Sequence, residues 1–118
     1  MDSSPSAELV FDRKWVLEQI GGDTELLHAI IEVFLVDSPD IRQQINAALH
    51  AGELKALHAA AHCAKSAVGN FGAPAAIKAA VELEEATKKG ETAQLELLTN
   101  SLCQALIEVE NTLRLELA

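Results

Sequence analysis

His62 and Lys65 are the residues whose types and spacing best suit chemistry in this sequence. A neutral imidazole is a nucleophile near physiological pH, and a lysine ammonium offsets the charge of an anion held beside it. Residues three or four positions apart lie on one face of a helix. If the segment is helical, the pair predicts a histidine that carries a phosphoryl group next to a cation.

The other residues one helical turn from His62 are His58, Ala59 and Ser66. Ala59 and Ser66 are small, so they leave clear space around the imidazole. The apolar stripe of this segment passes through Ala61, and the next residue lies about 100° further round a helix. We therefore expect His62 at the edge of the core, with one side of its ring open to solvent.

Two residues of the following segment are further candidates. We expect Glu84 to accept a hydrogen bond from the second ring nitrogen of His62 and so to fix its tautomer. Lys78 comes four residues after Pro74 and is expected near the same end of the molecule, where it would raise the association rate with an acidic partner. The alternative for Lys78 is an ordinary solvated charge.

A metal site is the main alternative interpretation, because His58 and His62 have the spacing of an HxxxH motif. Two ligands alone make a weak site. Ala59 stands where the glutamate of the zinc-protease motif would be, and Cys63 points about 100° away from His62. The sequence therefore predicts no metal site.

The charge balance is acidic, with 18 Asp and Glu, 9 Lys and Arg and a net charge of −9. This argues against nucleic-acid binding, which needs clustered basic residues, and against an anionic membrane surface. Residues 55–90, with five Lys and three Glu, are the only net basic third of the chain. This third contains His58 and His62.

Several features predict a cytoplasmic protein. No apolar run reaches the ~18 residues that span a bilayer, and residues 1–10 lack the basic start and apolar stretch of a secretion signal. Cys63 and Cys103 are far apart and have no CxxC spacing. We expect them to be free thiols that behave as small buried hydrophobic residues.

The composition predicts helices. Hydrophobic residues make up 49% of the chain, aromatics only 3%, and the abundant Leu and Ala are strong helix formers. Apolar periodicity, N-cap candidates and punctuating glycines place the helices. They are expected over residues 12–20, 24–50, 54–69, 74–89 and 95–113.

The second of these helices has an apolar stripe that keeps its phase across Pro39. Proline normally kinks or breaks a helix, so the stripe predicts either one kinked helix or two nearly collinear ones. Its members are Leu27, Ile31, Phe34, Ser38, Ile41, Ile45 and Ala48.

The length of 118 residues favours one domain. Residues 1–10 are expected to form a flexible N-terminal tail and residues 11–118 the domain itself. Short connections make neighbouring helices antiparallel, so the predicted fold is all-α: an up-down antiparallel four-helix bundle with a short extra N-terminal helix. No exposed apolar seam is expected outside the core, so we expect a monomer.

Residues 61–73 read Ala-His-Cys-Ala-Lys-Ser-Ala-Val-Gly-Asn-Phe-Gly-Ala. This segment resembles the signature of the histidine phosphotransfer domain family, roughly Ala-His-x-x-Lys-Gly-[Ser/Ala]-x-x-x-[Leu/Phe]-Gly-Ala. His62 matches the phosphoacceptor, Lys65 the family's lysine, and residues 72–73 the turn before the next helix. Weaker similarity at residues 22–27, 34–35, 83–84 and 90 extends the resemblance over residues 11–117. The departure is Ser66, where the family usually has glycine.

The resemblance implies a phosphorelay intermediate of two-component systems. His62 would accept a phosphoryl group from a receiver-domain aspartyl phosphate and pass it to another receiver aspartate. Lys65 would stabilise the phosphate, and a group of further residues would support the site or dock the partner: His58, Ala59, Ser66, Gly69, Lys78 and Glu84.

The partners implied are receiver domains of response regulators, a hybrid sensor histidine kinase, or both. Mg²⁺ is expected on the receiver, with no cofactor on this chain. No Gly-rich phosphate loop of the P-loop or Rossmann kind is present, so we expect a carrier without its own ATP-binding or kinase site. Two alternatives remain. One is an adaptor of the same fold that binds a receiver without carrying phosphate, although such a protein would usually lack the histidine, and the other is a metal-binding bundle.

Overall fold

The protein is described by a computed structural model over residues 10–118, so most of the predicted tail (residues 1–10) lies outside the described part. The described residues form helices and no strand. The five helices are α1 (Arg13–Gln19), α2 (Thr24–Ala51), α3 (Leu54–Gly69), α4 (Pro74–Lys89) and α5 (Leu95–Leu117). The predicted all-α fold is confirmed.

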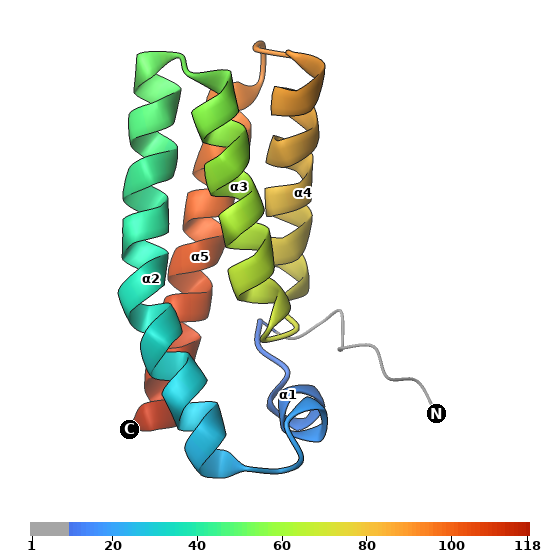
Figure 1. Ribbon diagram of the computed structural model, residues 1–118, viewed down its shortest axis with the longest axis vertical. Helices are drawn as coiled ribbons and strands as arrows, with labels where there is room; N and C mark the ends of the chain where they lie inside the picture. The colour runs from blue at the N-terminus through green and yellow to red at the C-terminus, as the bar shows by residue number, and fades with distance from the viewer. Residues whose placement is uncertain (1–9) are drawn as a thin grey trace.

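The four long helices stand side by side and alternate in direction, and α1 lies across one end near the connection between α3 and α4 (Figure 1). Sequence neighbours pack together as α2 with α3, α3 with α4 and α4 with α5, while α2 and α5 close the bundle. This is the predicted up-down four-helix bundle with a short extra N-terminal helix.

The helix ends follow the local sequence. The Asp12 side chain accepts a hydrogen bond from the Trp15 N–H at 3.1 Å, and Asp23 does the same for Leu26 at 3.0 Å. Each carboxylate thereby satisfies an N–H that has no partner within its helix. At the other ends of α2 and α4, Gly52 and Gly90 have left-handed φ angles of 69° and 71°, which glycine adopts without steric cost.

The two alternatives for the second helix are resolved in favour of one helix, because α2 runs without a break through Pro39. All seven members of its predicted stripe are buried, including Ser38. A proline inside a helix removes one backbone hydrogen bond. The continuous apolar face, packed against α3 and α5, holds the two halves in phase.

The connection between α3 and α4 is anchored by Phe71, which is buried. Its ring packs edge to face against Phe34 on α2 and Phe11 before α1, with centroid distances of 5.3 and 5.9 Å. The N–H of Asp12 also donates to the Phe71 carbonyl at 3.4 Å. These contacts fix the turn that sets α4 against α3, and the functional site lies between these two helices.

The two cysteines are free thiols, as predicted. Their expected burial is wrong for Cys63, which is exposed, and only partly right for Cys103, which is half-buried. Cys63 follows the buried Ala61 by two positions, about 200° round the helix, so its side chain faces away from the core. No helix within residues 10–118 is long and apolar enough to cross a membrane.

Candidate functional site

Three side chains on one face of α3 converge on a single residue of α4. The carboxylate of Glu84 lies 2.6 Å from His62 Nδ1 through Oε2 and 2.7 Å from Lys65 Nζ through Oε1. The main-chain oxygen of Glu84 lies 3.2 Å from His58 Nδ1. The α3 residues are spaced by four and three positions, which places them in one row along the helix.

The imidazole of His62 is open to solvent, with 59% of its side chain exposed, whereas Glu84 is only 14% exposed. The predicted hydrogen bond between them is present. A charged carboxylate only accepts, so Nδ1 of His62 carries the proton and donates it to Glu84. In the neutral ring, the lone pair then lies on Nε2.

Glu84 is held in its charged form. The hydrogen bond from Lys65 is the main cause that lowers the pKa of the Glu84 carboxyl, and the bond from His62 lowers it further, while partial burial acts in the opposite direction. A carboxylate that receives two such bonds stays charged at neutral pH. Glu84 therefore provides a fixed negative charge beside an exposed imidazole and an ammonium group.

Little covers the outer side of His62. Ala59 and Ser66 are both exposed, and no hydrogen bond links Ser66 to His62 among the residues that the structure describes. Gly69 lies two turns further along α3, where a Cβ would meet no atom within 4 Å. Serine at the position of the family's usual glycine thus leaves the imidazole accessible.

Comparison with known proteins decides the family. The sequence pattern described as "Hpt domain" matches residues 29–115, which is most of the chain. The chain belongs to the Hpt domain family. Hpt domains are phosphocarriers rather than kinases, and they interact with receiver domains and kinases in two-component phosphorelays. A phosphotransfer role in such a system follows for this chain.

Two solved structures are similar in fold. One is the histidine-containing phosphotransfer protein B (HptB) from Pseudomonas aeruginosa PAO1, at 24% identity and a TM-score of 0.84, over 92% of this chain and 95% of that one. The other is the HPT domain of a sensor hybrid histidine kinase from Shewanella, at 21% identity and a TM-score of 0.81, over 92% and 93%. At these identities the similarity supports the fold. No curated protein sequence matches the chain.

Lys78 was predicted to lie near the site, but it does not contact the residues around Glu84. It is strongly exposed, and the carboxylate of Glu82 on the same helix lies 4.0 Å from its Nζ. Six helical positions separate Lys78 from Glu84, which turns its side chain about 120° away. Glu84 contacts His62, Lys65 and His58, whereas Lys78 lies on the outer face of α4.

Thr87 contacts the site residues, although it was not among the site residues predicted from the sequence. It lies on the inward face of α4 and is buried. Its hydroxyl donates to the Glu84 carbonyl at 2.8 Å and lies 3.0 Å from His58 Nδ1. The available signal was a hydroxyl residue at a core position, since buried polar groups need partners.

Two hollows lie along the seam between α2 and α3. One is lined by residues of 30–37 and 67–71, and the other by residues of 44–51 and 53–63, ending at Cys63. Val33 and Val36 on α2 are exposed.

No group of three or more His, Cys, Asp or Glu side chains within residues 10–118 is arranged to hold a metal ion. His58 and His62, the pair with metal-motif spacing, both direct Nδ1 towards α4.

Proposed function

We propose that His62 is the phosphoacceptor of this Hpt domain: it takes a phosphoryl group from a receiver-domain aspartyl phosphate and passes it to the aspartate of another receiver. The observation that carries the proposal is the 2.6 Å hydrogen bond from Nδ1 to Glu84 on a ring that is 59% exposed. With Nδ1 engaged, Nε2 is the nitrogen left for the phosphoryl group.

The proposed transfer step starts from the tautomer of His62 that carries its proton on Nδ1. The Nε2 lone pair attacks phosphorus, the bond between phosphorus and the aspartyl oxygen breaks, and the receiver recovers its carboxylate. The ring becomes a phosphorylated imidazolium with its proton still on Nδ1. Glu84, held in its charged form, offsets the positive charge that develops on the ring, so it acts on the transition state as well as on the tautomer. Transfer to the next receiver reverses these changes.

Lys65 is proposed to stabilise the phosphoryl group. Its ammonium is bound to Glu84 Oε1 at 2.7 Å and its side chain is partly exposed. A lysine has a long flexible stem, so Nζ can turn from the carboxylate towards a phosphoryl group on the same face of α3. The added negative charge would then be shared by a cation one helical turn away.

The receiver is proposed to supply the aspartate and the Mg²⁺, while this chain supplies the nucleophile and a docking surface. Ala59 and Ser66 lie one helical turn to either side of His62 and have small side chains, so a partner can approach the ring closely. The hollow between α2 and α3 that Ala59 and Cys63 help to line offers apolar surface next to this part of α3. A hybrid kinase's receiver and a response regulator would dock there in turn.

The test is incubation with a receiver domain labelled on its aspartate by radioactive acetyl phosphate and Mg²⁺. We expect the label to move to this chain in an acid-labile, base-stable form. His62→Gln should carry no label, while His50→Gln, at the far end of α2, should be labelled normally. A label that persists in His62→Gln would contradict the proposal.

The direction of transfer needs a second stage. Labelled Hpt domain, freed from the first receiver, is mixed with an unlabelled second receiver and Mg²⁺. Loss of label from His62 with equal gain on the second receiver supports the relay. Retention of label on His62 with every receiver tested would contradict the onward step.

A further inference from the structure

His58 is bound to the main chain and to a buried hydroxyl of α4, and a residue that only docks a partner would not need these contacts. His58, His62 and Lys65 all bind Glu84, but only His58 binds its main chain. We propose that His58, together with Thr87, is a positioning residue that fixes Glu84 against α3 and thereby sets the tautomer of His62. This role rests on the proposed phosphoacceptor function of His62.

The hydrogen-bond roles around His58 follow from the chemistry of its partners. The carbonyl oxygen of Glu84 can only accept, and the Thr87 hydroxyl donates its one proton to it at 2.8 Å. His58 Nδ1 lies 3.2 Å from that oxygen and 3.0 Å from Thr87 Oγ1. Nδ1 therefore carries a proton and donates to both oxygens, and Thr87 accepts from His58 while it donates to Glu84.

This bond acts at the base of the Glu84 side chain. A glutamate has several rotatable bonds, so the place of its carboxylate depends on where its Cα lies and on what holds its oxygens. His62 and Lys65 hold the oxygens, and His58 holds the main chain one turn earlier along α3. Reactive groups need support of this kind, because small displacements weaken the contacts on which transfer depends.

Burial supports a positioning role. Thr87 is buried and His58 is half-buried, so their hydrogen bond lies on the inner side of the seam between α3 and α4. A residue that recognised a partner would present its hydrogen-bonding groups outwards, whereas His58 directs Nδ1 into the fold. His50, an exposed histidine in the last turn of α2, is the matched control.

The experiment measures the tautomer of His62 directly, by ¹⁵N NMR of the ring nitrogens in the unphosphorylated full chain, and then the rate of acceptance from a phosphorylated receiver. We expect His58→Leu and Thr87→Val to lower the share of the Nδ1–H form. Loss of one hydrogen bond corresponds to about a threefold to tenfold slower acceptance. His58→Asn, whose amide places a donor near the position of Nδ1, should recover most of the rate.

Each outcome decides the proposal. His50→Leu should change neither the tautomer nor the rate, and a similar loss in that variant would overturn the positioning role. A folded His58→Leu protein with the wild-type tautomer ratio and rate would overturn it as well. If His58→Leu fails to fold, Thr87→Val, which keeps the shape of the side chain, compared with Thr87→Ser gives the same test.

The positioning role and the proposed function fail separately. If His62 takes no label but its tautomer changes in His58→Leu, the proposed function is wrong and the positioning role stands. If His62 takes label normally and its tautomer and rate are unchanged in both His58→Leu and Thr87→Val, the positioning role is wrong and the proposed function stands.

Discussion

Two glutamates of this bundle are each shared by several donors, at different depths. Glu84 lies between α3 and α4, binds His62 and Lys65, and keeps 14% of its side chain exposed. Glu110 lies on α5 against α2 and is only 2% exposed. One carboxylate binds an imidazole that is exposed at the surface, and the other is enclosed.

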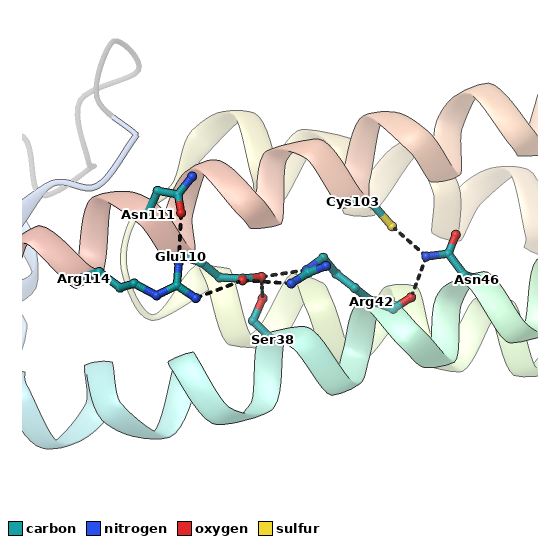
Figure 2. Close-up of polar contacts among 7 residues, drawn as sticks. All are labelled: Ser38, Arg42, Asn46, Cys103, Glu110, Asn111 and Arg114. Atoms are coloured by element: carbon teal, nitrogen blue, oxygen red, sulfur yellow. Dashed lines mark hydrogen bonds and ion pairs between the residues drawn. The ribbon is translucent and has the colours of Figure 1, made fainter.

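The cluster around Glu110 leaves neither of its oxygens free. Arg42 binds both oxygens, Nε to Oε2 at 2.8 Å and Nη2 to Oε1 at 3.0 Å, and Ser38 Oγ donates to Oε2 at 2.8 Å. Arg114, one turn further along α5, lies 3.7 Å from Oε1. Figure 2 shows these groups pointing toward one another between the two helices. The bond to Glu110 also raises the pKa of the Arg42 guanidinium.

The difference lies in the partners as much as in the depth. A guanidinium binds a carboxylate through a rigid planar fork, whereas a lysine is a flexible point charge. Glu110 is thus fixed in one geometry, and the partners of Glu84 are able to move. Lys65 can turn to a new anion and His62 keeps one nitrogen unbound by Glu84, so the site near the surface has room for chemistry.

The largest expected effect is on stability, from Glu110→Ala. This change leaves Arg42 and Ser38 at a buried seam without their acceptor, and breaking a buried pair in this way costs about 3 kcal/mol of unfolding free energy. Urea denaturation followed by circular dichroism measures the loss. Acceptance of the phosphoryl group by the folded fraction should stay near the wild-type rate, and a selective loss of that rate would break the comparison.

Glu84→Gln is expected to act mainly on transfer. The variant keeps the shape of the side chain but loses the charge that orients His62 and offsets the phosphorylated ring. Acceptance should slow about tenfold, while the unfolding free energy should fall by less than about 1 kcal/mol because the ion pair is partly exposed. Stopped reactions with a labelled receiver give the rate. A loss of stability as large as that of Glu110→Ala would contradict the contrast.

Ser38→Ala tests how much of the buried cluster depends on its neutral member. The variant removes one donor to Glu110 and leaves the Arg42 fork in place. We expect a loss of about 1 kcal/mol, typical of one hydrogen bond, from the same urea titration. Ser66→Ala, an exposed serine on α3, is the matched control for stability and should change it little.

The smallest expected effect is a pH dependence of the unfolding free energy that arises from the Glu84 carboxyl. Because its folded pKa is lowered, the stability that its charge contributes is fully present above the ordinary glutamate pKa of about 4.3 and is lost as the pH falls through the lowered value. The stability difference between wild type and Glu84→Gln should therefore be constant near neutral pH and shrink in acid. A difference that grows as the pH falls would contradict the assignment.

Much of the bundle was predictable because its signals are local. Apolar stripes, Asp12 and Asp23 as caps, and glycines after the helices fixed the five elements to within a few residues. Whether α2 continues through Pro39 was not predictable, since that depends on the packing of both halves against other helices.

The site was predictable only where it lies on one helix. The spacing of His62 and Lys65 led to the proposed chemistry, and the contact with Glu84 was an expectation about helix pairing. The role of Thr87 depends on the rotation of α4 about its axis, which the sequence leaves open. The same uncertainty in rotation explains why Lys78, expected near the site, faces outwards.

The buried cluster was missed although its signals were present. Ser38 interrupts an apolar stripe on α2, and Glu110 follows the buried Leu106 by one helical turn. Taken alone, each is a single polar residue on an apolar helix face, which a helix tolerates. Their pairing joins positions 72 apart in the chain, and nothing local connects them.

This separation has a kinetic consequence. Three of the four sides of the bundle join helices that follow one another in the chain, so those sides can form as local helical hairpins with little loop entropy. The side between α2 and α5 closes last in such an order, and the bonds of Glu110 form with it. We therefore expect Glu110→Ala to speed unfolding while refolding stays nearly unchanged, which makes this carboxylate a determinant of how long the folded carrier lasts.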